Sequence, residues 1–143
     1  MMRTQAQRHR GFTLIEVMVV VAILGLLAAM VVPNLIGRDE DARINKAKQD
    51  ISALENALDM YRLDNFSYPT TDQGLEALVS KPAGAPEPKR YKQGGYIKKL
   101  PMDPWGNPYQ YLRPGTHSDT DIYSFGPDQT PSEDDIGNWN LDQ

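Results

Sequence analysis

The sequence predicts an α+β fold, in which one long N-terminal helix packs against a small three-stranded antiparallel sheet. Three observations support this prediction. A long, mostly apolar stretch comes first, from Gly11 to Ile36. A segment in which apolar residues recur at helical spacing follows it, and the C-terminal third holds three short strand-like runs between loops rich in Pro, Gly, Asp and Asn. One face of such a sheet covers the apolar stripe of the helix, which is an α+β arrangement.

The stretch from Gly11 to Ile36 is expected to be the membrane-spanning first half of the long helix. It holds a single charge, Glu16, and about 20 apolar residues in a helix cross a hydrocarbon core of about 30 Å. In lipid the backbone polar groups of a single span must pair within their own segment, which requires a helix. Arg3, Arg8 and Arg10 precede the stretch without any acid. This asymmetry predicts a cytoplasmic N-terminus, with the rest of the chain across the membrane.

Glu16 is unusual because a carboxylate inside a span is costly and is expected to have a partner. No Lys, Arg or His lies close to it within the span. One candidate partner is the new amine of Phe12, which forms if the chain is cut between Gly11 and Phe12, in the same subunit or a neighbouring one. The alternative is that Glu16 lies at the headgroup level and is simply hydrated. The spacing does not decide between these interpretations.

A secretory signal peptide is a rival interpretation of the same N-terminal region. It would require cleavage near Ala28, behind the apolar run. The run continues beyond Ala28 through Met30, Val31 and Val32, which favours a retained span.

The junction before the apolar run has a recognisable pattern. It reads Arg10-Gly11-Phe12-Thr13-Leu14-Ile15-Glu16-Val17: a basic leader ending in Gly, then Phe, and a Glu four residues later. This pattern resembles the cleavage and methylation site of type IV pilin-like proteins. The resemblance implies that a prepilin peptidase cuts after Gly11 and methylates the new Phe12 amine. It also implies a role for Glu16 in subunit assembly.

The segment after the apolar stretch predicts a soluble amphipathic helix that continues to about Leu63. Apolar residues recur there at spacings of three and four, which places them on one helix face: Ile44, Ala47, Ile51, Leu54, Leu58 and Tyr61. A short second helix is predicted at Leu75–Val79. Residues 81–95 are predicted to be loop because of their Pro and Gly content.

Three short runs are predicted to be the strands of an antiparallel meander: Tyr96–Leu100, Tyr109–Leu112 and Asp121–Phe125. Between the first two lies Leu100–Tyr109, with the sequence LPMDPWGNPY. Three X-Pro steps and a Gly predict a tight turn, which Trp105 can anchor by burying its ring. A binding loop is the alternative interpretation of this segment.

The same segment indicates a particular family among the type IV pilin-like proteins. Together with the upstream run Leu58–Tyr61 and the downstream run Asp135–Trp139, it is similar to the major pseudopilin, the G-type subunit, of the type II secretion system. The resemblance implies a pilin-like fold and a homopolymeric helical pseudopilus in the Gram-negative periplasm, growing from the inner membrane to help drive folded proteins across the outer membrane. The implied partners are the prepilin peptidase, the inner-membrane assembly platform and the minor pseudopilins. The implied organisation is a leader (1–11), a transmembrane and assembly helix (12–36) and a periplasmic domain (37–143).

The C-terminal acidic loop is a candidate metal site. Asp128 stands at one end, Glu133, Asp134 and Asp135 at the other, and Ca²⁺ takes six to eight oxygen ligands from carboxylates and carbonyls. The spacing is not that of an EF-hand, and a solvated acidic tail is the simpler interpretation of the residues alone. The resemblance implies instead a calcium site formed by the carboxylates of Asp128, Asp134 and Asp135. The backbone carbonyls that it implies belong to Phe125, Thr130 and Ser132.

Composition argues against several other functions. The chain has no Cys, so it has neither a disulfide nor a thiolate site, and its two histidines lie in the leader and in a loop. No catalytic arrangement is visible, and we expect no enzymatic activity. The net charge is −4, and loss of the leader arginines makes it more negative, which argues against nucleic-acid binding. The alternative to a filament subunit is a monomeric membrane-anchored periplasmic binding module or minor pilin-like module.

Overall fold

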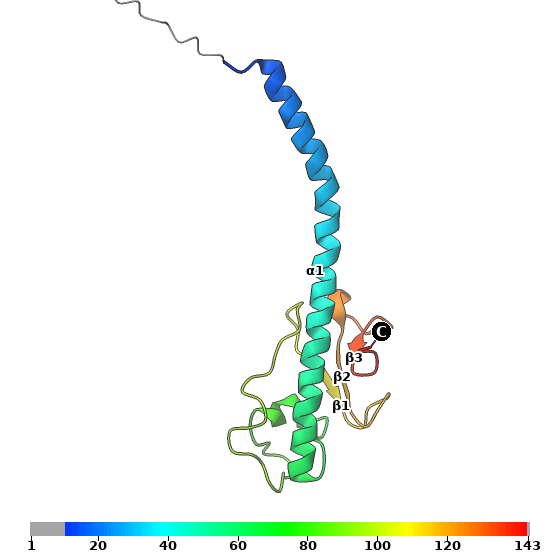
Figure 1. Cartoon of the computed structure of the whole chain (residues 1–143). Coiled ribbons are helices and arrows are strands. Elements are labelled where there is room, and N and C mark those ends of the chain that lie inside the picture. Colours follow the sequence, from blue (N-terminus) through cyan, green and yellow to red (C-terminus); the bar gives the residue numbers. More distant parts are fainter. Residues whose placement is uncertain (1–10, 143) are drawn as a thin grey trace, which may run out of the picture. The chain divides into compact units, whose positions relative to one another are not determined.

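The computed structural model describes residues 11–142, and for residues 31–37 it describes the helical backbone and not the side chains. The predicted leader, including Arg3, Arg8 and Arg10, therefore lies outside the described residues. The chain divides into two compact units, Met1–Asp39 and Glu40–Gln143, which are considered separately below. One helix, α1, extends from Leu14 to Asn65 and contributes to both (Figure 1).

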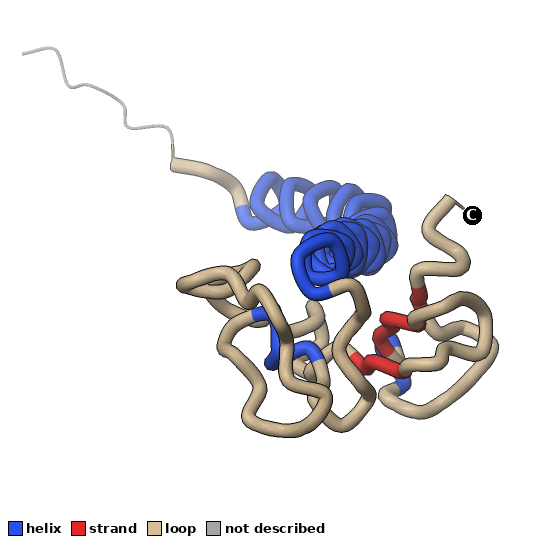
Figure 2. The backbone as a smooth tube through the Cα atoms, turned by 90° about the horizontal axis from the view of Figure 1, so that it is seen from below, coloured by secondary structure: helices blue, strands red, loops and turns tan. Residues whose placement is uncertain are grey.

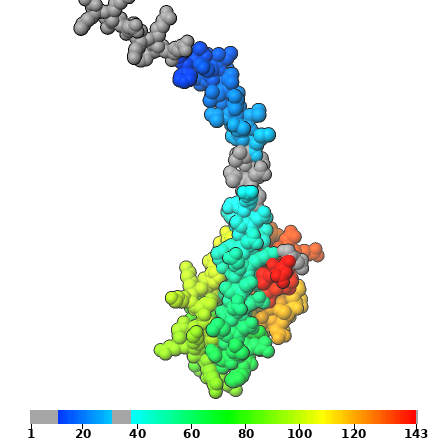
Figure 3. Space-filling view, in the orientation of Figure 1, coloured from blue at the N-terminus to red at the C-terminus, as the bar shows by residue number. Residues whose placement is uncertain are grey.

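The described part of the first unit is an apolar helix with exposed side chains (Figure 3). Phe12 is 86% exposed, and large apolar residues such as Leu14 and Leu26 are also mostly exposed. Among the described residues, no helix combines the length and the apolar character that crossing a membrane requires.

In the second unit, the predicted stripe of α1 forms the core, which confirms the helical pattern. Ala47, Ile51, Leu54, Leu58 and Tyr61 are all buried. The helix ends at Asn65, slightly beyond the predicted position, because the next residue, Phe66, adopts a left-handed conformation with φ 64°. The buried side chain of Asn65 secures this end: its Nδ2 donates to the Tyr61 carbonyl, and its Oδ1 accepts from the backbone N–H of Arg90.

The sheet is three-stranded and antiparallel, as predicted, with the order β1 (Gln110–Leu112), β2 (Asp121–Ser124), β3 (Ile136–Gly137). Tyr111 pairs with Ile122, and Ser124 pairs with Ile136. One residue from each strand joins the hydrophobic core of α1: Tyr111, Ile122 and Ile136. The strands and loops of this unit lie along one side of the C-terminal half of α1 (Figure 2).

The prediction of a first strand at Tyr96–Leu100 is wrong. This segment forms turns, because the backbone N–H groups of Tyr96 and Ile97 both donate to the Leu78 carbonyl, at 2.7 and 3.2 Å, instead of to a neighbouring strand. The third strand is β3, a two-residue element near the C-terminus. The predicted strand Asp121–Phe125 ends one residue earlier, at Ser124, and the predicted strand Tyr109–Leu112 begins one residue later, at Gln110.

Two short 3₁₀ helices complete the second unit. The first, η1 (Leu75–Leu78), replaces the predicted helix Leu75–Val79 and buries Leu75, Ala77 and Leu78 against the core. The second, η2 (Gly126–Asp128), is separated from β2 by Phe125 alone and begins the acidic loop. The turn around Trp105 is closed by a bridge between Met102 and Pro108, and Trp105 packs against the core, which confirms the predicted tight turn anchored by Trp105.

Candidate assembly and cation-binding sites

The predicted assembly residue Glu16 lies in the first turn of α1. Its Oε2 accepts from the backbone N–H of Thr13 at 3.2 Å and from the Thr13 hydroxyl at 3.4 Å, and its own N–H donates to that hydroxyl at 3.4 Å. This reciprocal arrangement is a capping box, with Thr13 at the N-cap and Glu16 at the third helical position. The Thr-x-x-Glu pattern is visible in the sequence, but the capping role of Glu16 was not among the predictions, which were an ion pair with the Phe12 amine or simple hydration.

Phe12, the predicted methylated residue, lies in an exposed segment without regular secondary structure just before the helix, together with Gly11. The amine that would pair with Glu16 exists only after cleavage between these two residues. In the uncut chain the carboxylate is held by Thr13, one residue from the future amine.

The acidic loop follows β2 and ends at β3, so the sheet holds both of its ends. Asp128 accepts from the backbone N–H and the hydroxyl of Thr130, at 3.3 and 3.1 Å. Asp135 accepts from the backbone N–H of Ser132 at 3.2 Å. Asp128 and Asp134 are exposed, whereas Asp135 is buried beside β3.

The structure does not gather the three aspartates into one ligand set. Within the part of the chain that the structure describes, no group of three or more His, Cys, Asp or Glu side chains lies close enough to hold a metal ion. The donor chemistry nevertheless fits a hard cation, because residues 125–135 offer carboxylate, hydroxyl and carbonyl oxygens and include no Lys or Arg. The neighbouring Tyr123 is sensitive to this charge: burial raises its pKa, and the carboxylates of Asp135 and Asp121 raise it further.

Comparison with known proteins decides the family. The model of the type II secretion system (T2SS) protein G family matches residues 34–139, and the model of the prokaryotic N-terminal methylation motif matches residues 6–32. The chain belongs to the type II secretion system protein G family. The type II secretion system core protein G of Aeromonas hydrophila is 64% identical over 138 residues, which cover 96% of each chain. The core protein G of Pectobacterium carotovorum subsp. carotovorum is 61% identical over 137 residues, covering 95% of this chain and 88% of the relative.

A solved structure of the same family shares the fold. The crystal structure of the major pseudopilin from the type 2 secretion system of enterohaemorrhagic Escherichia coli matches with a TM-score of 0.72 at 60% sequence identity. The match covers 79% of this chain and 96% of that chain. The predicted resemblance, the α+β pilin-like fold and the role as a structural subunit instead of an enzyme are therefore confirmed.

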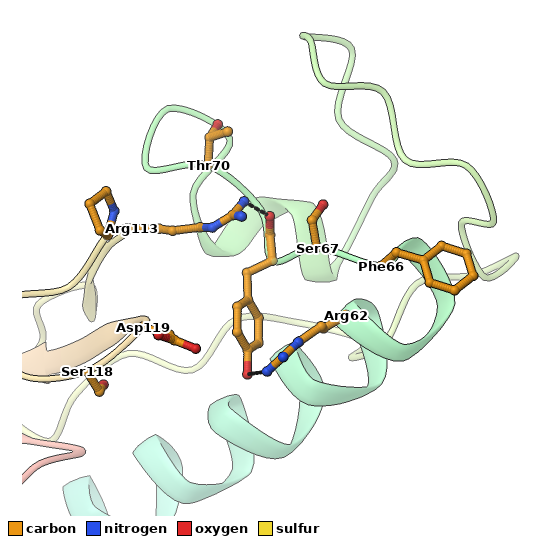
Figure 4. Close-up of a pocket in the computed structure, with 9 residues that line it drawn as sticks. Arg62, Phe66, Ser67, Thr70, Arg113, Ser118 and Asp119 are labelled. Atoms are coloured by element: carbon orange, nitrogen blue, oxygen red, sulfur yellow. Dashed lines mark hydrogen bonds between the residues drawn. The ribbon is translucent and has the colours of Figure 1, made fainter.

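A recess of the protein G domain lies elsewhere, between the end of α1 and the loop after β1. Its volume is about 610 Å³, and Arg62, Arg113 and Asp119 line it (Figure 4). The guanidinium groups are already engaged: Arg113 donates to the Tyr68 carbonyl, and Arg62 donates to the Tyr68 hydroxyl at 3.2 Å. Tyr68 in turn donates to an oxygen of Asp59 at 2.7 Å. Because both guanidinium groups bond to Tyr68, these contacts hold the segment around Tyr68 between α1 and the loop after β1.

Proposed function

We propose that this chain polymerises into the type II secretion pseudopilus as its major structural subunit, and thereby helps to drive folded proteins across the outer membrane. The observation that carries this proposal is the contrast between its two units. Residues 40–143 bury a core of their own, whereas Phe12 to Met30 expose large apolar side chains almost without interruption. Such a surface requires cover. Lipid supplies the cover before assembly, and the same segments of neighbouring subunits supply it in the filament.

The proposed location is the inner membrane, with a single pass, a cytoplasmic N-terminus and a periplasmic C-terminal domain. The apolar stretch Gly11–Ile36 and the arginines that precede it support this topology. The proposed boundaries are a leader at 1–11, a transmembrane and assembly helix at 12–36 and a periplasmic domain at 37–143.

Processing is proposed to occur between Gly11 and Phe12 by a prepilin peptidase, which also methylates Phe12. The match of the N-terminal methylation motif to residues 6–32 supports this step. The new amine then lies close to Glu16, because Glu16 already accepts from the N–H of the adjacent residue, Thr13. An ion pair between this amine and Glu16, within one subunit or between neighbours, would neutralise a carboxylate that is otherwise costly among apolar helices. The inner-membrane assembly platform and the minor pseudopilins are the further proposed partners.

Calcium is the proposed ligand of the acidic loop. The proposed ligands are the carboxylates of Asp128, Asp134 and Asp135 and the carbonyls of Phe125, Thr130 and Ser132. Oxygen-only chemistry and the lack of a basic residue between Phe125 and Asp135 support this proposal. A bound cation would neutralise the mutual repulsion of the loop carboxylates.

The central proposal can be tested in a bacterium that lacks its own protein G. The full-length chain should restore secretion and, when overproduced, should form filaments that contain it and are visible by electron microscopy. Secretion without any such filament would favour the alternative, a monomeric membrane-anchored module. Failure of both, with normal chain levels and the other secretion components intact, would contradict the proposal.

A further inference from the structure

A buried aspartate holds the turn at residues 101–108. Asp103 is only 4% exposed. Its Oδ1 accepts from the backbone N–H groups of Trp105 and Asn107, at 3.1 and 2.7 Å, and its own N–H donates to the Asn107 carbonyl at 2.8 Å. One carboxylate oxygen is therefore sufficient to close the turn. The second oxygen has a different partner, outside the turn.

That second oxygen connects the turn to the acidic loop through one serine. The hydroxyl of Ser124, the last residue of β2, donates to Asp103 Oδ2 at 2.6 Å, and both side chains are buried. The same hydroxyl accepts from the backbone N–H of Gly126 at 3.1 Å. A hydroxyl has one hydrogen and two lone pairs. Because Asp103 takes the hydrogen, a lone pair of Ser124 is available for the Gly126 N–H.

Gly126 is the point at which the chain leaves the sheet. Its φ is +71°, a left-handed conformation that a residue with a side chain rarely adopts, and it is the first residue of η2 (Gly126–Asp128). The bond from Ser124 holds the backbone in this conformation. The far end of the loop has a separate attachment, since Asn140 Nδ2 donates to the Asp135 carbonyl at 2.9 Å and Ile136 pairs with Ser124.

We propose that Asp103 and Ser124 are positioning residues for cation binding by the acidic loop. They hold the backbone at Gly126 and thus the near end of the loop, which carries Phe125 and Asp128. Without this attachment the near end must be ordered when the cation binds, and the affinity falls accordingly. Loss of a hydrogen bond that supports a metal ligand costs about 10–100-fold in metal affinity. The inference rests on the proposed calcium site and assigns a role to the DPWGNP turn, which the filament function alone does not explain.

The test uses the full-length chain in detergent and Tb³⁺ as a luminescent substitute for Ca²⁺. Ser124→Ala removes the link but leaves the bonds of Asp103 within the turn. Ser118→Ala is the matched control, because the Ser118 hydroxyl also lies within hydrogen-bond distance of an aspartate, Asp121, at the other end of β2. We expect Ser124→Ala to weaken Tb³⁺ binding by at least about tenfold and Ser118→Ala to leave it unchanged. A role in stability alone would lower the melting temperature of Ser124→Ala equally in calcium and in chelator, without changing the affinity for Tb³⁺.

The outcomes separate this inference from the proposals on which it rests. Wild-type affinity in Ser124→Ala would overturn the positioning role and leave the calcium site standing. A wild-type chain that binds no Tb³⁺ and melts identically in calcium and chelator would overturn both, but not the filament function. If Ser124→Ala does not fold, Asp103→Asn decides. The amide oxygen of this variant can still accept from the N–H groups of Trp105 and Asn107, but its NH₂ group faces the Ser124 hydroxyl in place of the carboxylate oxygen. Unchanged Tb³⁺ affinity in this variant would also refute the inference.

Discussion

Asn138 donates from Nδ2 to Oε1 of Glu55 at 3.0 Å, and so joins the C-terminal segment to helix α1 across 83 positions of sequence. The same side chain makes two further bonds. Its Oδ1 accepts from the N–H of Ile122 in β2 at 3.2 Å, and its Nδ2 donates to the carbonyl of Thr120, the residue before β2, at 2.9 Å. One amide thus connects the C-terminal segment both to α1 and to the region of β2.

Asn138→Ala should therefore lower the free energy of unfolding by about 1–3 kcal/mol, because it leaves buried backbone partners unsatisfied. Thermal or denaturant unfolding of the full chain would measure this. Asn56→Ala is the control, since exposed Asn56 donates to the Ser52 carbonyl of its own helix, and it should change stability by less than about 0.5 kcal/mol. Equal stability of Asn138→Ala and the wild type would contradict the proposed connecting role.

A second prediction concerns acid stability and Asp121. Burial opposes ionisation of this carboxyl, but the backbone N–H and ring of His117, with the N–H groups of Thr116 and Ser118, outweigh it and hold the pKa of Asp121 below its usual value. A carboxyl whose pKa is lower in the folded state stabilises the fold above its ordinary pKa, about 3.9. That stabilisation decreases as the pH falls below this value and is lost once the pH passes the folded pKa.

Asp121→Asn should accordingly be less stable than the wild type at neutral pH, and the difference should shrink as the pH is lowered below about 4. Equilibrium unfolding across this pH range measures it. A stability difference that stays constant with pH would show that the charge of Asp121 does not contribute.

The third prediction separates two roles of Glu16. Gln can replace Glu in a capping box, so Glu16→Gln keeps the cap seen with Thr13 but removes the charge. If the charge pairs with the Phe12 amine in the filament, Glu16→Gln and Glu16→Ala should both insert in the membrane and both assemble poorly, since breaking a buried ion pair from one side costs about 3–5 kcal/mol. Filament yield and membrane content would be measured together.

Thr13→Ala is the control for the third prediction, because it removes the hydroxyl of the cap and keeps the charge of Glu16. It should cost only about 0.5–2 kcal/mol of helix stability and should still assemble. Wild-type filament yield from Glu16→Gln would assign Glu16 to the cap alone.

The fourth prediction is that the mature chain begins at Phe12 with a methylated amine. Intact mass and N-terminal sequencing of the membrane form would establish both. Gly11→Val should leave the leader attached, because a branched side chain replaces the hydrogen next to the bond that is cut, and Ala6→Val within the leader should be processed normally. A mature chain that begins near Met30 would instead indicate a secretory signal peptide.

The fifth prediction is that the chain melts at a higher temperature in calcium than in chelator. A ligand that binds only the folded state stabilises it by about 2.7 kcal/mol at a hundredfold excess over Kd. Mg²⁺ should do less, because it requires a smaller octahedral shell and loses water reluctantly. Asp128→Ala and Asp135→Ala should abolish the difference between calcium and chelator and should reduce assembly and secretion.

Asp72→Ala, which removes an exposed carboxylate outside the loop, is the control for the fifth prediction and should keep the calcium response. A wild-type chain that melts at one temperature in calcium and in chelator would show that the acidic loop is a solvated tail.

By itself, the sequence determined the parts of this protein that rest on repetition or on a local pattern. The stripe from Ile44 to Tyr61 recurs over several helical turns, so each residue supports the assignment of the next. It packs in the core as predicted, with Ile44 partly buried and the residues from Ala47 onward buried. The short pattern from Arg10 to Glu16 and the turn around Trp105 were enough to indicate the family. The acids of the C-terminal loop could also be named as candidate ligands from their residue types alone.

Only the tertiary structure decided which segments pair and which polar groups meet. Tyr96–Leu100 has the composition of a strand, but the Leu78 carbonyl takes its N–H groups, whereas Ile136–Gly137 is too short for any periodicity and becomes a strand because β2 offers it partners. The hydrogen bond between Asp103 and Ser124 joins residues 21 positions apart, and no periodic pattern in the sequence indicates it. Hydrogen bonds between distant segments depend on where the core places each backbone, and a sequence pattern records only the spacing of residues along one element.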